Sequence, residues 1–287
     1  MEKNRVLLVG NCVLDQVWQL PYFPAQDEEM RAINCTRLIG GNACNSAQML
    51  ALLKNEVELV CSLAQDASSE WLLRELSTRG IGTRHCIQQP GYSTPESSIW
   101  LNSLNGSRTI AHHRNLPELG LESLQNIEPE SYRWIHFEGR NIRVLKSYLA
   151  TFRHPNCLLS LEIEKDRPDI EKLLPYVHVA IVSNAYLRSR KISATECLQY
   201  FRQINSALNV VCTLGADGLI ALDDRGKLIE IAAQPVARVV DTIAAGDCFI
   251  AGLIHQMLQL EPFYAALDYA HKLAARKIQF QGIKLND

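Results

Sequence analysis

The segment VVDTIAAGDCFIAGLI, residues 239–254, places a carboxylate beside three small residues and directly before a helical pattern. Apolar residues recur at helical spacing after Asp247, so we predict that this aspartate lies in the first turn of an amphipathic helix. The first N–H groups of a helix have no partner within it, and Ala244, Ala245 and Gly246 leave room for an anion to reach them. Asp247 could then accept a proton from a substrate hydroxyl beside a bound phosphoryl group. An ordinary helix-capping role is the alternative.

A second polar segment, GGNACNS, contains Asn42 and Asn45 at the start of another helical pattern. The two asparagines stand one helical turn apart, so their amides face the same way and suit a polyhydroxylated ligand. Asn42 could equally be an ordinary cap. Farther along, Thr213, Gly215 and Gly218 in TLGADG would let a nucleotide approach the backbone, or would only form a turn between strands.

Some common nucleotide-binding motifs are missing. There is no G-x-x-x-x-G-K-[ST] loop and no G-x-G-x-x-G after the first predicted strand, where Gly10 stands alone. P-loop nucleotide hydrolysis and NAD-linked hydride transfer therefore lack their usual sequence elements. His112 and His113 are adjacent on a predicted strand and point to opposite faces, so we expect them at the surface and not on a shared metal.

The elements that must position these residues are short apolar runs ending in polar residues. The runs begin near residues 5, 57, 133, 157, 177 and 209, and helical patterns separate them. This alternation predicts an α/β fold with helices on both faces of a mainly parallel sheet, whose ligands bind at the carboxyl ends of the strands. The polar or small residues at or just past these ends are Asp15, Glu138, Glu162, Glu164, Ser183 and Gly215.

Two segments interrupt this alternation. SSIWLNSLNGSRTIAHH carries Asn105-Gly106 between two β-like runs, which predicts a hairpin with a type I′ turn. DQVWQLPYFPAQDEEMRAINCTRLIGG lacks a helical period, and we expect it to pair with the hairpin as a small separate sheet, a lid over the site. An extension of the main sheet's edge is the alternative. The expected division is a core of residues 1–11, 36–93 and 114–287 and a lid of residues 12–35 and 94–113.

The chain has 287 residues, 47% of them hydrophobic, and a formal net charge of -2. One large α/β domain with an appendage fits this length. The absence of a basic block argues against nucleic-acid binding, and no apolar run reaches the roughly 18 residues that a membrane helix needs. Nine cysteines without a C-x-x-C pair are typical of thiols in a reducing compartment, so neither disulfides nor zinc is expected. A first strand at Arg5 leaves no room for a signal peptide, so we expect a cytoplasmic protein.

Taken together, GGNACNS and DTIAAGD resemble the two signatures of the ribokinase-like, phosphofructokinase-B-type carbohydrate kinases, and the likeness runs from end to end. VGNCVLDQV, NGSRTI, WIHFEGRN, LEIEK and the terminal FQG are similar, in this order, to the family's ketohexokinase branch. The resemblance implies a three-layer α/β/α ribokinase-like fold. It also implies transfer of the γ-phosphoryl group of ATP to a primary hydroxyl of a keto-sugar such as fructose, with Mg²⁺ and a monovalent cation such as K⁺ as cofactors.

Carried over by position, the resemblance assigns a role to each candidate residue. Asp247 would be the catalytic base, and the anion hole would consist of Ala244, Ala245, Gly246 and Asp247. The sugar would be bound by Asp15, Gly41, Asn42 and Asn45, with Asp27 reaching from the lid toward the partner's site in a dimer. The nucleotide would be bound by Arg108, Thr213, Gly215, Gly218, His271 and Ile278. A monovalent cation would lie near Asp241 and Thr242.

Two features depart from the family pattern. Ala244 replaces a glycine of D-T-x-G-A-G-D and adds a methyl group to the anion hole. The family's N-x-x-E element, which helps to organise Mg²⁺, is missing however residues 183–187 are aligned with it, and the ketohexokinase branch lacks it too. Mg²⁺ would then be held mainly by ATP and water. Glu162 and Glu164, on one face of a predicted strand end, could help to bind it or could simply be a solvated strand end.

Two other functions fit the same residues. A nucleoside, aldose or other furanoside kinase of this fold would keep the motifs and change the acceptor. A non-catalytic sugar- or nucleotide-sensing module would keep the pocket without turnover, although the intact Asp247 argues against it.

The lid also predicts an assembly. A small sheet can cover only one of its faces with its own core, and an exposed apolar face usually marks an interaction surface, so we expect a two-fold homodimer through the lids. The large apolar residues of the lid are Trp18, Leu20, Ile33, Trp100, Leu101 and Ile110.

Overall fold

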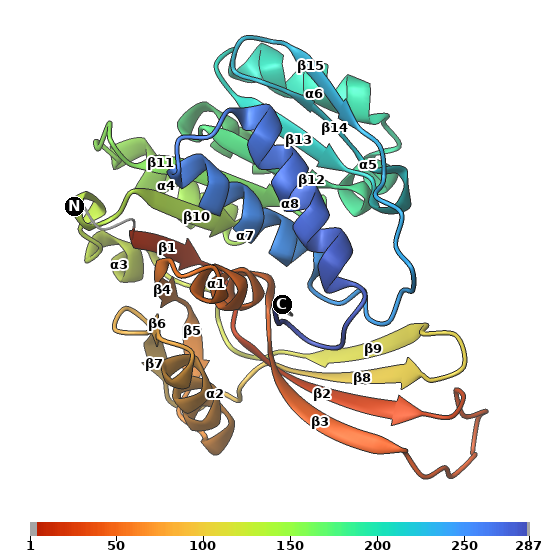
Figure 1. The fold of residues 1–287 in the computed structure, drawn as a ribbon. Helices are drawn as coiled ribbons and strands as arrows, with labels where there is room; N and C mark the ends of the chain where they lie inside the picture. Colours follow the sequence, from red (N-terminus) through yellow and green to blue (C-terminus); the bar gives the residue numbers. More distant parts are fainter. Residues whose placement is uncertain (1–4, 286–287) are drawn as a thin grey trace.

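A nine-stranded sheet runs through the centre of the computed structural model, which describes residues 5–285 (Figure 1). Its order is β15-β14-β13-β12-β11-β10-β1-β4-β6, and only the β13-β14 and β14-β15 pairs are antiparallel. The mainly parallel sheet is therefore confirmed. The strands are β1 (Arg5–Val9), β4 (Glu56–Val60), β6 (Ile81–Gly82), β10 (Trp134–Glu138), β11 (Leu158–Ile163), β12 (Val179–Ser183), β13 (Asn209–Thr213), β14 (Leu219–Leu222) and β15 (Leu228–Ile231).

Helices cover both faces of this sheet, which gives the expected three layers. On one face lie α1 (Asn42–Leu52), α2 (Ala67–Thr78), α7 (Ala245–Leu258) and α8 (Phe263–Lys277). On the other lie α3 (Leu121–Gln125), α4 (Ile142–Thr151), α5 (Asn184–Arg190) and α6 (Ala194–Ile204). Three short 3₁₀ helices complete the described elements: η1 (Pro129–Ser131), η2 (Ile170–Tyr176) and η3 (Gly215–Asp217).

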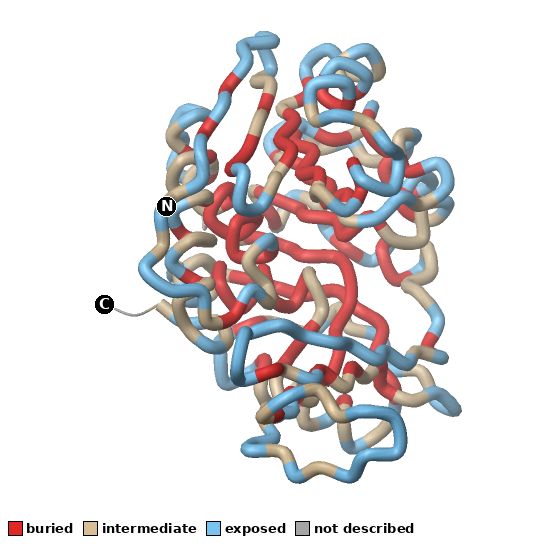
Figure 2. The backbone as a smooth tube through the Cα atoms, turned by 90° about the vertical axis from the view of Figure 1, so that its right-hand side faces the viewer, coloured by how far each residue is buried: buried red, intermediate tan, exposed pale blue. Residues whose placement is uncertain are grey.

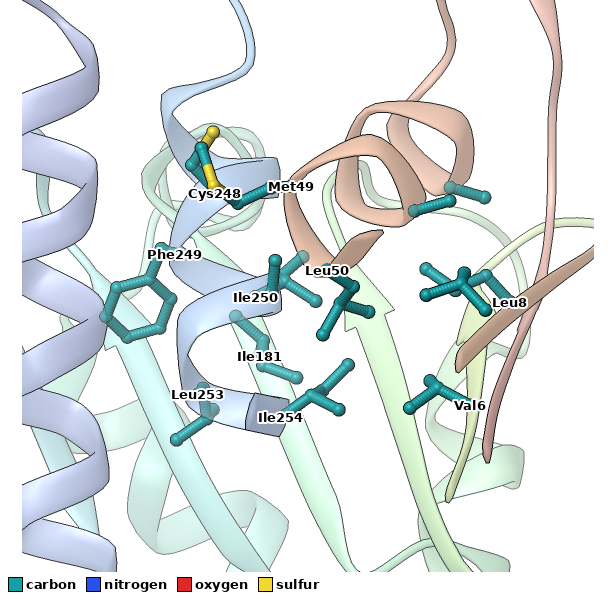
Figure 3. Packing of buried hydrophobic residues seen from close by; sticks show 14 of the residues in the cluster. Val6, Leu8, Met49, Leu50, Ile181, Cys248, Phe249, Ile250, Leu253 and Ile254 are labelled. Carbon is teal, nitrogen blue, oxygen red and sulfur yellow. The ribbon is translucent and has the colours of Figure 1, made fainter. Parts of the chain in front are cut away.

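Alternate residues of β1 enter two different cores. Val6 and Leu8 join the cluster with α1 and α7 (Figure 3). Leu7 and Val9 join the cluster on the opposite face. Successive side chains of a strand point to opposite sides, so a strand covered on both sides reads as a continuous apolar run. Figure 2 shows the result as a band of buried chain through the middle of the molecule, with exposed segments around it.

Helix α7 begins where the sequence pattern predicts. Phe249, Ile250, Leu253 and Ile254 are buried at helical spacing, and complete burial of such side chains stabilises a fold by about 1.5–3 kcal/mol each. At Gly252 the helix α7 comes so close to α8 that a Cβ added to this glycine would lie 3.0 Å from the Cα of Ala270. This packing fixes the N-terminus of α7, and with it Asp247, relative to the sheet.

The segments predicted as a lid form a separate four-stranded sheet, so the edge-extension alternative is wrong. Its order is β3-β2-β8-β9, and Figure 1 shows it projecting from one side of the core. The strand β3 continues past residue 35, so it crosses the boundary expected between lid and core. Residues 1–4 and 286–287 of the expected core lie outside the described residues. The lid strands are β2 (Val13–Leu20), β3 (Asn34–Gly40), β8 (Glu96–Asn102) and β9 (Arg108–His113), and β5 (Ser62–Ala64) and β7 (Ile87–Gln89) form a further pair.

The large apolar residues of the lid are divided between its two faces. Leu101 lines a cavity and Ile110 a cleft between the lid and the core. Trp18 and Trp100 are neighbours on the parallel strands β2 and β8 and point to the opposite, outer face, where they are 36% and 41% exposed. The register explains the division, because it brings the odd residues of β8 to the inner face and the even ones to the outer face.

The hairpin between β8 and β9 is present, but its turn is not the expected type I′. A type I′ turn needs positive φ at both central residues, and of Asn105-Gly106 only the glycine has it, at φ 70. The Asn105 side chain instead accepts hydrogen bonds from the amide and the hydroxyl of Ser107, at 2.9 and 2.7 Å. The side-chain bonds of asparagine thus stabilise a longer loop in place of the two-residue turn.

Candidate active site

Two clefts meet at the N-terminus of α7. The first, of about 550 Å³, lies between the inner face of the lid and the carboxyl ends of β10, β11 and β12. The second, of about 440 Å³, lies between η3, the end of β13 and helix α8. Thr242, Ala245 and Gly246 line both. A ligand could therefore extend from one cleft into the other past the start of α7.

Asp247 lies in the first turn of α7 and is 6% exposed. Its Oδ2 accepts a hydrogen bond of 2.8 Å from Nδ2 of Asn45, and α7 has no side-chain cap, so the capping alternative is wrong. The pKa of Asp247 is raised to about 7, mainly by burial. The charges of Glu138 and Glu164 also raise it, whereas the hydrogen bond from Asn45 and the charge of Lys277 lower it. The carboxyl group can thus gain or lose a proton near neutral pH.

Ala244 is the residue before α7 and has the left-handed φ of 60. An L-residue with a Cβ is strained there by about 1–2 kcal/mol, which explains why a glycine is expected in the family pattern. The turn is nevertheless formed, and the first amides of α7 open toward the junction of the clefts. The added methyl group has therefore not prevented this turn from forming.

The start of α1 forms the wall opposite Asp247. Gly41 is the residue before the helix, with φ 95, and an added Cβ would lie 2.4 Å from the carbonyl oxygen of Asn11. The helix therefore begins tightly against the β1–β2 connection. Asn42 and Asn45 both line the first cleft, as their spacing predicts. Asn42 is not an ordinary cap, because its Nδ2 donates to Oε1 of Glu162 at 2.8 Å.

Three glutamates lie at the strand ends beside Asn42. Nδ2 of Asn42 also donates to Oε2 of Glu164 at 3.3 Å, and Glu138 accepts from the amide of Asn11 at 2.9 Å. Oε2 of Glu162 is buried without a hydrogen-bond partner among the described residues. Burial, followed by the charges of Asp247, Glu138 and Glu164, raises the pKa of Glu162 well above its ordinary value.

Asp15 reaches the same cleft from the lid strand β2. Burial raises its pKa to about 6, against a hydrogen bond from Ser97 that lowers it. Gly40 makes room for this carboxylate, since an added Cβ would lie 2.1 Å from its Oδ2. His112 is exposed, as expected, and it also lines the first cleft, with Nδ1 3.1 Å from the Ser97 hydroxyl. The lid thus contributes polar groups to the cleft as well as covering it.

The second cleft collects the residues that the resemblance assigned to the nucleotide: Thr213, Gly215, Gly218, His271 and Ile278. Its lining is mostly small or apolar, as the flat face of a base requires. Nε2 of His271 accepts from the amide of Gln234 at 3.2 Å, and burial lowers the pKa of this imidazole. Gly215, which the sequence places with the other strand-end residues, lies in this cleft and not in the first.

Arg108 projects from β9 into the first cleft and donates a hydrogen bond to the hydroxyl of Thr242. It therefore connects the lid to the loop that precedes α7. Asp241, one residue earlier in that loop, accepts a hydrogen bond of 2.8 Å from Nζ of Lys277. Asp27 is exposed on the lid, with φ 63, and lies outside both clefts.

Several residues of the clefts were not in the predicted site. Lys165 and Arg167 line the first cleft, but basic residues after a strand carry no distinctive signal. Lys277 lies outside both clefts, where it contacts Asp241, and it did have a signal. It continues the buried spacing of Ala266, Ala270 and Leu273 along α8, where a lysine is unexpected.

Within residues 5–285, no three histidine, cysteine or acidic side chains are arranged to hold a metal ion by themselves. In the same part of the chain, no helix is long and apolar enough to cross a membrane.

A family model described as pfkB family carbohydrate kinase matches residues 3–285. The chain belongs to this family. It is 30% identical to mouse ketohexokinase over 293 residues, which cover 98% of each protein, and 23% identical to Escherichia coli pseudouridine kinase over 94% of this chain and 88% of that protein. The structure of Arabidopsis thaliana ribokinase complexed with ribose and ATP is similar at a TM-score of 0.79 and 20% identity, over 98% of this chain and 94% of that one.

These similarities establish a ribokinase-like fold and a kinase of sugars or nucleosides, that is, a phosphotransferase. The non-catalytic reading from the sequence is therefore not supported. The relatives are named as kinases of different acceptors, a ketohexose and pseudouridine, so membership of the family alone does not identify the substrate of this chain.

Proposed function

We propose that this kinase transfers the γ-phosphoryl group of ATP to a primary hydroxyl of a keto-sugar, as fructose would offer. The observation that carries the proposal is the buried carboxylate of Asp247 at the junction of a polar cleft and a mostly small or apolar one. The similarity to mouse ketohexokinase over almost the whole of both chains supports the choice of a ketose.

Asp247 acts as the general base in this proposal. A base is most effective when its pKa lies near the working pH, and burial raises that of Asp247 to about 7. The bond from Asn45 keeps one carboxylate oxygen fixed and leaves the other for the acceptor hydroxyl. The proton of that hydroxyl would pass to Asp247 as its oxygen forms the bond to phosphorus and the bond to ADP breaks.

The anion hole stabilises the negative charge on the transferring group. Backbone amides of residues 244–247 supply donors at a helix N-terminus, where the helix dipole also favours an anion. Arg108 adds a positive charge from the lid and is already bonded to Thr242 at the same junction. Closure of the lid over this junction would also exclude water that could accept the phosphoryl group.

The sugar would lie between the lid and the start of α1. Asp15 and the two asparagines of α1 offer acceptors and donors for several hydroxyls. Gly41 also lines this cleft, and its lack of a side chain lets α1 begin tightly against the β1–β2 connection. The second cleft would hold the nucleotide, with His271 and Ile278 beside the base.

Mg²⁺ fits at the glutamates of the first cleft. Oε2 of Glu162 is buried and has no partner among the described residues, and Glu164 is near enough to share Asn42 with it. Mg²⁺ is usually held by one or two carboxylates together with phosphates and water, so three protein ligands are not required. When bound, the ion neutralises charge on the phosphates of ATP.

A homodimer through the outer face of the lid is part of the same proposal. Trp18 and Trp100 form an exposed apolar pair there, and exposed aromatic residues are typical of interaction surfaces. Asp27 on the same lid lies outside this chain's own clefts, which leaves it free to reach a partner's site. The free thiols of all nine cysteines support a cytoplasmic location.

The test is ATP consumption by the purified protein across a panel of ketoses, aldoses and nucleosides, followed by identification of the phosphorylated carbon. We expect the highest kcat/KM with a ketose and phosphate on a primary hydroxyl. The Asp247→Asn variant is the control for contaminating kinases. Preference for a nucleoside or an aldose would refute the keto-sugar proposal and leave the family assignment intact.

A further inference from the structure

Lys277 is a buried charge that the proposed reaction does not use. It ends α8 on the buried side of that helix and is 2% exposed. Removing an ammonium group from water costs several kcal/mol unless it is paired and hydrogen-bonded. Its partners should therefore reveal what it contributes.

The partners of Lys277 belong to one residue, Asp241. Nζ donates to the carboxylate Oδ2 at 2.8 Å and to the main-chain oxygen at 2.9 Å. The remaining bonds of the carboxylate are also made within the chain, because Oδ1 accepts from the amide of Ile243 at 2.8 Å and Oδ2 from that of Gly282 at 3.0 Å. The carbonyl of Ile278 accepts from the amides of Val240 and Asp241. The end of α8 is thus tied to the loop before α7.

The same loop is where the family resemblance placed a monovalent cation, beside Asp241 and Thr242. Both residues are already in contact with a positive side chain of this chain, Asp241 with Lys277 and Thr242 with Arg108. A free cation at Asp241 would have to share oxygens that the ammonium already uses, and it would be repelled by the ammonium at short range in a site of low dielectric constant. The residues present do not fit a separate K⁺ ion.

We propose that the ammonium of Lys277 takes the place of a monovalent cation and makes this kinase independent of K⁺. Bonded to both the carboxylate and the main chain of Asp241, it holds the turn from which Ala244, the anion-hole amides and Asp247 follow. Lys277 is therefore a positioning residue, since it touches neither of the clefts assigned to sugar and nucleotide. The kinetic part of this inference rests on the proposed kinase reaction, whereas its structural part does not.

The wild-type protein gives the first test. Turnover and melting temperature are measured in KCl, RbCl and choline chloride at equal ionic strength, since choline is too large for a cation site. We expect both quantities to be the same in the three salts, and crystals grown in RbCl to show no anomalous Rb⁺ peak at Asp241. Activation by K⁺ over choline, or a Rb⁺ peak at Asp241, would overturn the inference without affecting the kinase assignment.

Two variants give the second test. Lys277→Ala removes the ammonium and leaves room for an ion beside Asp241, so we expect a lower melting temperature and lower turnover in choline, with partial recovery of both in KCl. The matched control, Asp241→Asn combined with Lys277→Ala, lacks the carboxylate and should not respond to K⁺. If Lys277→Ala in choline chloride had the same melting temperature and turnover as the wild type, that result would contradict the positioning role. If Lys277→Ala does not fold in any salt, the wild-type measurements and the Rb⁺ crystals decide.

Discussion

Replacement of Asp247 by asparagine should change activity and stability in opposite directions. The substitution keeps an acceptor for Nδ2 of Asn45 but removes the proton-accepting carboxylate. Loss of a general base typically lowers turnover by about two to four orders of magnitude. Binding of ATP should change little, because the amides of the anion hole remain.

The stability of Asp247→Asn follows from the raised pKa. The ordinary value is 3.8, and burial raises the pKa of Asp247 to about 7 in the folded state. At a pH between these two pKa values, Asp247 is ionised in the unfolded chain but still protonated in the folded one, so ionisation favours unfolding. The free-energy cost of ionising Asp247 in the folded protein is absent below the pKa of the unfolded chain. It increases as the pH rises and is complete above the pKa of the folded protein. At about 1.4 kcal/mol per pH unit it reaches about 4 kcal/mol at most, which asparagine would remove.

Asp241→Asn is a matched control six residues earlier. Asp241 is as deeply buried, at 7% exposed against 6%, but its carboxylate is paired with Lys277. Removing one partner of a buried ion pair usually destabilises a protein by about 3–5 kcal/mol, because the other charge stays buried without its partner. The same chemical change at two buried aspartates should therefore stabilise in one case and destabilise in the other.

The measurement is thermal unfolding of both variants and the wild type in metal-free buffer from about pH 4 to about pH 8, the range over which the cost is expected to develop. Asp247→Asn should melt several degrees above the wild type at the upper end, and the gain should shrink toward the lower end. Near wild-type turnover by Asp247→Asn would refute its catalytic role. A lower melting temperature than the wild type at the upper end would refute the electrostatic argument.

Three further predictions concern the lid and the start of α7. Arg108→Ala should raise KM for ATP while the affinity for sugar alone, measured by calorimetry, stays nearly unchanged; equal loss of both would contradict a phosphate-binding role. Ala244→Gly should stabilise the protein by about 1 kcal/mol in denaturant unfolding, because glycine removes the strain at φ 60, and a loss of stability would show that the methyl group is favourably packed. If the proposed lid dimer forms, Trp100→Glu should convert it into a monomer, as measured by light scattering at micromolar concentration. A wild-type monomer with full activity would refute the lid dimer, and a dimer unaffected by the charge would move the interface elsewhere.

The sequence by itself determined the order of strands and helices and the local environment of the polar residues. Apolar runs in β1, β10 and β11 and the helical spacing after Asp247 are local patterns, and burial on two faces or on one side of a helix follows from them directly. The spacing of Asn42 and Asn45 likewise fixed their common direction, because three residues make nearly one helical turn.

Only the tertiary structure decided which charges meet. Asp241 and Asp247 lie in one short segment, yet one is paired with Lys277 from the end of α8 and the other with Asn45 from α1, and nothing local distinguishes these partners. The faces of the lid were also undecided, because a shift of one residue in register moves Trp100 or Leu101 to the opposite side. Long-range pairing and strand register depend on the packing of segments far apart in the chain, and that information is not contained in the periodicity of any one of them.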